Sequence, residues 1–93
     1  MRKTIEVEYV GIEDIQEIIE DAYALMREGH YVNVEISQGV FSVAVSVMIM
    51  LDGFDSNGKY DYDYRFYMTD AERDVNSMYE CKSTLNNLLC EEE

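Results

Sequence analysis

The fold is set by residues 31–68, which read YVNVEISQGVFSVAVSVMIMLDGFDSNGKYDYDYRFYM. Runs rich in β-branched and aromatic residues are separated here by two turn signals, Gln38-Gly39 and Asn57-Gly58. This pattern predicts a meander of three antiparallel strands, near residues 31–37, 40–53 and 60–68.

Each turn, placed on its own as a two-residue hairpin loop, predicts a register. The first turn puts apolar residues opposite apolar residues, in the pairs Ile36–Phe41, Val34–Val43 and Val32–Val45. The second turn does the same on the same side of the central strand, in the pairs Leu51–Tyr64, Ile49–Phe66 and Val47–Met68. Because a one-residue slip would turn every side chain to the other face, this agreement supports the meander.

Helical periodicity lies on both sides of the meander. From Ile12 to Gly29, where the helix is expected to stop, the apolar residues predict one buried stripe made of Ile15, Ile18, Ile19, Ala22, Leu25 and Met26. Thr69-Asp70-Ala71-Glu72 has the pattern of a capping box and predicts the start of a second helix. The apolar face of that helix is expected to be Ala71, Val75, Met78, Leu85, Leu88 and Leu89.

A further strand is predicted before the first helix, at Thr4–Tyr9, where apolar residues and glutamates alternate. Both helices need the same hydrophobic sheet face. We therefore expect a single α+β domain over residues 1–93, a two-layer sandwich in the order β-α-β-β-β-α. Both helices should lie on the Val43/Val45/Val47 side of the sheet, which leaves the other face open.

A net charge of −13, from 20 acidic and seven basic residues, dominates the composition. A charge this large repels itself and opposes the compact state, so it should serve solubility, repulsion of nucleic acid or attraction to a basic partner. With 47% hydrophobic residues the chain is unlike a disordered acidic tail. The sequence has neither a secretory signal pattern nor an apolar run long enough to span a bilayer, so we expect a cytoplasmic protein.

The two cysteines, Cys81 and Cys90, are expected to be reduced. On one continuous helix they would lie on opposite faces and roughly 13.5 Å apart along the axis. A disulfide needs Cα atoms within about 7 Å of each other. Both residues are then expected to serve as small apolar side chains in a reducing cytosol.

The open sheet face offers a candidate partner-binding site. The predicted register places Met48, Met50 and Tyr67 there as an apolar island, in an acidic field made of Glu35, Asp52, Asp61 and Asp63. Asp52 and Asp63 are expected to lie opposite each other, which is unfavourable for like charges. Met is also common at adaptable binding surfaces. Two interpretations stay open: a partner site with an apolar centre, or a solvated face with scattered apolar residues.

Motifs for catalysis, metals and cofactors are missing from the sequence. The acidic hairpin suggests a calcium loop, but with Gly58 in the sixth position Gly53 and Tyr64 would stand where carboxylates are needed. A single histidine, His30, and two cysteines are too few for a zinc site. We expect no enzyme, catalytic residue, metal or cofactor, although a weak divalent-ion site among Asp52, Asp55, Asp61 and Asp63 stays open.

Direct binding to nucleic acid is not expected. Helix, three antiparallel strands and helix is the layout of the double-stranded RNA-binding domain, whose last helix begins with basic residues. Here the corresponding segment, Thr69–Asp74, carries three acids that would repel phosphates. The acidic surface is also repelled by anionic membranes.

In size, charge and element order the chain resembles the small acidic inhibitors that phages encode against nucleic-acid machinery, in particular anti-CRISPR proteins of the DNA-mimic type. The resemblance covers roughly residues 12–80: the helix from Ile12, Tyr31-Val-Asn-Val-Glu-Ile-Ser, the Asn57-Gly58 hairpin and the acidic segment after it. It implies a protein that occupies the DNA-reading groove of a CRISPR effector nuclease. The predicted strand at residues 3–9 has no counterpart there, and the resemblance assigns no site residue.

The sequence therefore predicts a non-enzymatic inhibitor or adaptor that binds a basic, nucleic-acid-binding protein. Alternate residues on a strand lie about 6.6–6.8 Å apart, so Asp61 and Asp63, or Glu6 and Glu8, can imitate part of a phosphate backbone. The alternative is a small structural or assembly protein, in one form a homodimer that covers Met48 and Met50, with charge serving solubility. If the sheet face is not the site, the next candidate is the acidic face of the first helix, Glu13, Glu17, Glu20 and Asp21.

Overall fold

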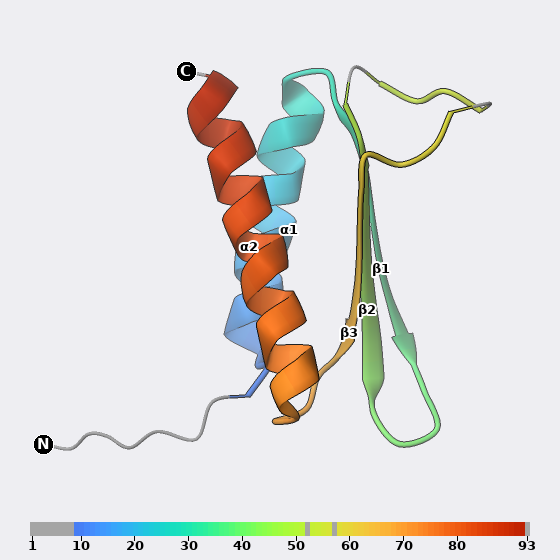
Figure 1. The fold of residues 1–93 in the computed structure, drawn as a ribbon, viewed down its shortest axis with the longest axis vertical. Helices are drawn as coiled ribbons and strands as arrows, with labels where there is room; N and C mark the ends of the chain where they lie inside the picture. The colour runs from blue at the N-terminus through green and yellow to red at the C-terminus, as the bar shows by residue number, and fades with distance from the viewer. Residues whose placement is uncertain (1–8, 52, 57, 93) are drawn as a thin grey trace, which may run out of the picture.

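The computed structural model describes residues 9–51, 53–56 and 58–92. Its elements follow the order α1 (Ile12–Arg27), β1 (Tyr31–Gln38), β2 (Val43–Met50), β3 (Tyr62–Tyr67) and α2 (Glu72–Glu92). The α+β class is confirmed for this part of the chain, with two helices and a three-stranded antiparallel sheet in the order β1-β2-β3 (Figure 1). Most of the strand predicted at residues 4–9 lies outside the described residues.

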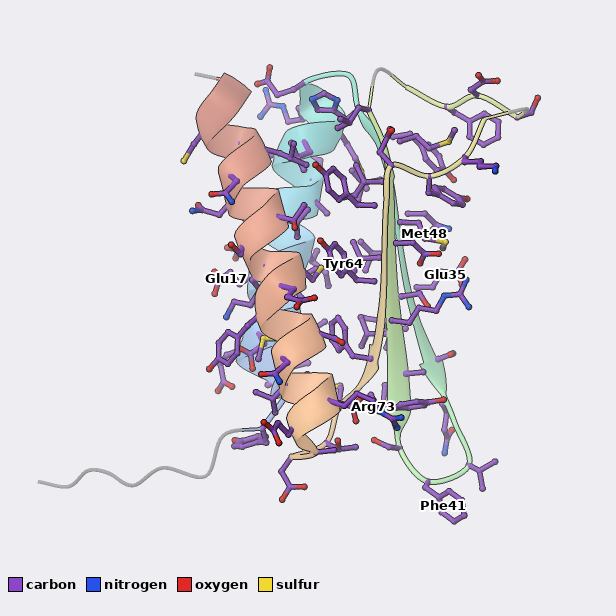
Figure 2. All side chains as sticks on the ribbon, viewed as in Figure 1. Glu17, Glu35, Phe41, Met48, Tyr64 and Arg73 are labelled. Carbon is purple, nitrogen blue, oxygen red and sulfur yellow. The ribbon has the colours of Figure 1, made fainter. Side chains whose placement is uncertain are left out.

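Both helices cover one face of the sheet, as the shared apolar face of the strands predicts (Figure 1). Helix α1 packs on β1, α2 packs on β3, and the two helices lie side by side. The core between the layers contains Val45, Val47 and Ile49 of β2 together with Ile15, Ile18 and Leu25 of α1 and Met78, Cys81 and Leu85 of α2. Tyr64 points into this space, where its hydroxyl lies 2.6 Å from Thr84 Oγ1 of α2 (Figure 2).

The predicted register of the first hairpin is wrong by four residues. Val34 pairs with Val47 rather than Val43, and Ile36 pairs with Val45 rather than Phe41. The turn lies two residues further along the chain than predicted, since the amide of Gly39 donates to the carbonyl of Ser42 (2.8 Å) and so closes the hairpin there. Val40 and Phe41 then fall in the turn, where Phe41 is 98% exposed (Figure 2).

The second register is displaced by the same amount. Tyr64 pairs with Val47 rather than Leu51, and Phe66 pairs with Val45 rather than Ile49. Asp63 stands opposite Met48, so the predicted pairing of Asp63 with Asp52 is also wrong. Both slips are even, and side chains alternate with a period of two, so every strand residue keeps its predicted face.

The two helices differ from the prediction at particular positions. Ile19 and Met26, which were expected in the core, are 45% and 43% exposed. The expected stop at Gly29 is confirmed: its φ of 101° lies in the left-handed region that glycine adopts without strain.

The start of α2 does not form the predicted capping box. The amide of Thr69 donates to the carbonyl of Tyr67, and the hydroxyl of Thr69 accepts from the amide of Ala71. The buried carboxylate of Asp74 holds the junction instead, because it accepts from the amide of Tyr67 (3.1 Å) and the hydroxyl of Thr69 (2.7 Å). The helix accordingly begins at Glu72 rather than Thr69.

Candidate functional site

The residues predicted for the sheet-face site lie on or beside the open face, where the structure describes them. Glu35 is exposed on β1 and accepts from the side-chain amide of Asn33 (3.0 Å). Asp63 is exposed on β3, 3.5 Å from Nε of Arg65. Asp61 precedes β3 and its carboxylate accepts from the amide of Leu51 (2.8 Å), which ties the two ends of the β2–β3 loop together. Asp52 lies outside the described residues.

Met48 and Met50 do not form an exposed island, which corrects the prediction. They point to the open face, yet they are only 9% and 5% exposed. For Met50 the reason is the long connection between β2 and β3, which extends on the open side of the sheet (Figure 1). There Phe54 packs against Tyr31, with ring centroids 5.0 Å apart, and Gly58 lies so close to Met50 that a Cβ on it would stand 3.2 Å from Cε of the methionine.

Tyr67 remains half exposed and lines a groove of about 620 Å³ at the edge of β3. The groove is lined by Ala44, Val45, Ser46, Arg65, Phe66, Tyr67, Arg73, Asp74 and Ser77. Arg73 reaches it from the first turn of α2 (Figure 2). Because two arginines line the groove and Asp74 is already hydrogen-bonded, this part of the sheet face does not favour a basic partner.

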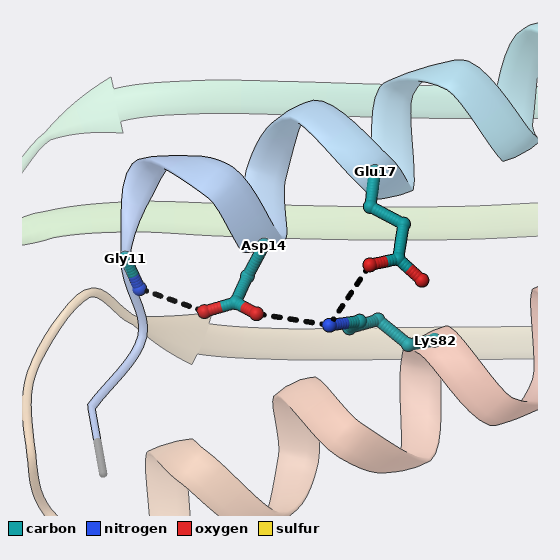
Figure 3. A network of polar contacts seen from close by, with 4 residues as sticks. All are labelled: Gly11, Asp14, Glu17 and Lys82. Atoms are coloured by element: carbon teal, nitrogen blue, oxygen red, sulfur yellow. Dashed lines mark hydrogen bonds and ion pairs between the residues drawn. The ribbon is translucent and has the colours of Figure 1, made fainter. Parts of the chain in front are cut away.

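The acidic face of α1 is organised around Lys82 of α2 (Figure 3). Nζ of Lys82 lies 2.9 Å from Oδ1 of Asp14 and 3.1 Å from Oε1 of Glu17. The other carboxylate oxygen of Asp14 accepts from the amide of Gly11 (2.9 Å) and so satisfies a donor at the start of the helix. One lysine thus joins the two helices.

The pKa values of Asp14 and Lys82 both move toward the charged form of the side chain. Burial alone would raise the pKa of Asp14, but the hydrogen bonds from Gly11 and Lys82 outweigh it and lower that pKa below 3.8. Burial alone would lower the pKa of Lys82, but its bonds to Asp14 and Glu17 raise it above 10.5.

Asp21, one turn beyond Glu17, shows the opposite effect. Burial and then the charges of Glu17 and Glu20 raise its pKa, and the attraction of Lys82 does not compensate. The charges of Glu17 and Glu20 thus act on Asp21, and these three residues together with Glu13 are here named the helical acidic face.

Other chemistry is limited in the described part of the chain. No three His, Cys, Asp or Glu side chains come together there in a group that could hold a metal ion. Cys81 and Cys90 are both free, as predicted. Burial raises the pKa of the Cys81 thiol to about 12, which makes it a poor nucleophile, whereas Cys90 is exposed. The described helices include none with the length and hydropathy of a membrane span.

Comparison of the chain with protein-family models, with curated proteins and with solved structures found no match.

Sequence reasoning missed Lys82 and the exposed apolar residues of α1. Lys82 is the only basic residue between Arg73 and the end of the chain, and its position beside an apolar stripe could have signalled a contact between helices. The apolar positions of α1 also span too wide an arc for one buried stripe, which could have signalled a second surface.

Proposed function

We propose that this protein is a non-enzymatic inhibitor or adaptor that binds a basic, nucleic-acid-binding protein through its helical acidic face. The crowding of Glu17, Glu20 and Asp21 carries this proposal. After burial, the charges of Glu17 and Glu20 raise the pKa of Asp21, and a basic partner would relieve this repulsion between the three carboxylates. The proposed mode of action is steric and electrostatic occupation of a groove that otherwise holds nucleic acid, in the cytoplasm, as anti-CRISPR proteins of the DNA-mimic type do.

The arrangement of the acids supports this surface over the sheet face. Residues four apart on a helix rise about 6 Å along its axis, so Glu13, Glu17 and Asp21 form a regular row of carboxylates. A row on a packed helix is rigid, and rigidity lowers the entropy cost of binding. On the sheet face, by contrast, the methionines are covered and two arginines line the groove.

The test compares two double variants that each remove two negative charges. Glu13→Gln with Glu20→Gln changes the helical acidic face, and Glu35→Gln with Asp63→Asn changes the sheet face as the matched control. Both pairs are exposed, so both variants should stay folded. The probe is a panel of CRISPR effector nucleases loaded with guide RNA, whose binding to a labelled DNA duplex is followed by fluorescence anisotropy.

We expect the wild-type protein to displace the duplex from at least one nuclease, and to do so less well as salt is added. The helical variant should associate more slowly and show a weaker salt dependence, while the sheet variant should match the wild type. Inhibition by both variants at wild-type rates, or no displacement from any nuclease in the panel, would contradict the proposal as stated. Loss of inhibition in the sheet variant alone would show that the binding site lies on the sheet face, at Glu35 and Asp63.

A further inference from the structure

A second surface lies on the side of the molecule away from α2. Five large apolar side chains are between 43% and 61% exposed there: Ile12, Ile19, Tyr23 and Met26 of α1, and Ile36 of β1. The four α1 residues follow one another by seven, four and three positions, so they fall within about 60° of arc on the helix. We name these five residues the apolar stripe.

The position of the apolar stripe follows from the contacts of α1. Asp14 and Glu17 face α2, because both lie against Lys82. The stripe is roughly 140–160° around the helix from these two residues, and so it faces away from α2. Since α1 packs on β1, the stripe runs beside the outer edge of that strand.

That edge of β1 carries backbone groups that no described residue binds. The hydrogen bond from Gly39 to Ser42 shows that odd-numbered residues of β1 bond to β2. The amides of Val32, Val34, Ile36 and Gln38 therefore point outward. At the other edge of the sheet the amides of Asp63 and Arg65 point outward by the same rule, while the amide of Tyr67 is taken by Asp74.

The β1 edge also lacks the features that protect edge strands. It is eight residues long, has no proline or lysine, and bears a single charge, Glu35. An exposed, β-branched edge of this length is a template for pairing with another strand. Its apolar neighbours on α1 make an unpaired state more unfavourable still.

We propose that two copies of this chain associate through this surface, β1 against β1 and α1 against α1, about a two-fold axis perpendicular to the sheet. Two antiparallel copies of β1 satisfy each other's outward amides and carbonyls, which makes the contact self-complementary. The sheets then join into one with the strand order β3-β2-β1-β1-β2-β3. Because α1 lies over β1, the two copies of α1 come within reach of the roughly 8–10 Å at which helices pack.

The area of the surface fits a weak to moderate dimer. The five side chains of the stripe, one aromatic and four aliphatic, are each about half exposed and together present an apolar surface on the order of a few hundred Å² per copy. Together with the strand edge this approaches the roughly 800 Å² per partner of a standard interface.

The net negative charge of the chain makes the stability of the dimer depend on salt but does not prevent the dimer from forming. Glu17 and Asp21 lie on the far side of α1 from the stripe, whereas Glu13 and Glu20 lie only about 90–110° around the helix from its centre and bring negative charge nearer to the other copy. Salt at about 0.1 M screens charges beyond about 10 Å. The dimer should therefore strengthen as salt is added, whereas binding of the acidic face to a basic partner should weaken. Because added salt affects the two contacts in opposite directions, failure of this inference can be distinguished from failure of the proposed function.

The first experiment measures mass against protein concentration by analytical ultracentrifugation, at about 50 mM and about 500 mM NaCl. We expect a reversible shift from 10.8 kDa toward twice that mass, at lower protein concentration in the higher salt. Tyr23→Lys should weaken the dimer at least tenfold. The matched control Tyr67→Lys removes a half-exposed tyrosine from the open sheet face and should dimerise as the wild type does. Both variants lower the net negative charge equally, so reduced repulsion cannot explain a difference between them.

The second experiment locates the contact by amide hydrogen exchange. In the dimer the amides of Val32, Val34 and Ile36 should exchange at least tenfold more slowly than in dilute monomer, while those of Asp63 and Arg65 should not change. A monomer at every concentration up to about 1 mM would overturn the inference. So would equal dimerisation of Tyr23→Lys, or slow exchange of the β1 amides in a monomer, which would mean that the same chain covers its own edge.

Discussion

Asp14 has two structural roles that cannot be recognised from its position in the first turn of a predicted helix. Its carboxylate accepts from the amide of Gly11 and binds Lys82, so it both caps α1 and joins α1 to α2. The sequence indicates only that an anion is favourable at the start of a helix. The partner could not be predicted, because Lys82 lies 68 residues away and any of several exposed acids could have bound it.

We expect Lys82→Met to destabilise the protein by about 1 kcal/mol, mainly because the half-buried Asp14 loses its cation, whereas the 55% exposed side chain of Glu17 is screened by solvent and loses little. The control Lys59→Met, at an exposed loop position, should change stability by less than about 0.5 kcal/mol. Urea denaturation followed by circular dichroism measures both. Equal effects of the two variants would show that the Lys82 contact contributes nothing to stability.

Asp21 and Asp14 should respond to pH in opposite ways. The folded pKa of Asp14 is lowered, so this residue stabilises the fold above its unfolded pKa of 3.8, and that contribution is lost as the pH falls through the folded pKa. The folded pKa of Asp21 is raised, so its favourable contribution is present below 3.8 and is lost as the pH rises through the folded value.

At pH 7, therefore, Asp21→Asn should stabilise the protein by about 0.5 kcal/mol, because it removes a like-charge pair with Glu17 at i, i+4 spacing. Asp14→Asn should destabilise it. Both differences from the wild type should shrink as the pH falls below about 4, where the carboxyls take up protons. Thermal unfolding of the three proteins between pH 3 and pH 7 checks this, and a destabilised Asp21→Asn at pH 7 would contradict it.

At the scale of the elements, the strands show what hydrophobic alternation can and cannot predict. Alternation places Val34, Val45 and Val47 on the helix side correctly, because that depends only on the period of two. It does not distinguish the observed register from one displaced by four residues, since both place apolar residues opposite each other. The predicted two-residue turns therefore selected the wrong even register. The cover over Met50 was missed for the same reason, because a short hairpin would have left no chain to fold over it.

The junction between β3 and α2 provides a test at this scale. Asp74→Ala should destabilise the protein by about 2–3 kcal/mol, because the amide of Tyr67 and the hydroxyl of Thr69 lose a buried charged acceptor. Asp70→Ala, on the exposed side of the same junction, should cost less than about 0.5 kcal/mol. Chemical denaturation of the two variants gives the comparison. A capping box built on Thr69 and Glu72 would instead make Glu72→Ala the more damaging change.

At the scale of the whole molecule, the net charge of −13 was evident from the sequence, but its distribution was not. In the folded chain one set of acidic residues lies along α1, and two arginines line the groove beside β3. The apolar stripe is a separate surface that consists of uncharged residues. These groupings depend on which helix covers which strand. For that reason the sequence could not separate an acidic face from an apolar one.

Because the whole chain repels itself, added salt should stabilise the monomer. We expect Tm to rise between about 20 mM and about 500 mM NaCl, by about 4–8 °C for each kcal/mol of repulsion that is screened. The measurement is made at protein concentrations too low for association. The Glu13→Gln, Glu20→Gln variant should respond less than the wild type. A fall in Tm with salt would mean that ion pairs such as Lys82–Asp14 outweigh the repulsion.

The contrast between the two thiols has a practical consequence. Cys90 is exposed near the end of α2, whereas Cys81 is enclosed in the core with a thiol that resists ionisation. A maleimide dye added to the native protein should therefore attach at one position, without any engineered residue. Because Cys90 belongs to neither the helical acidic face nor the apolar stripe, the same labelled protein can report by fluorescence on association with itself and with a basic partner.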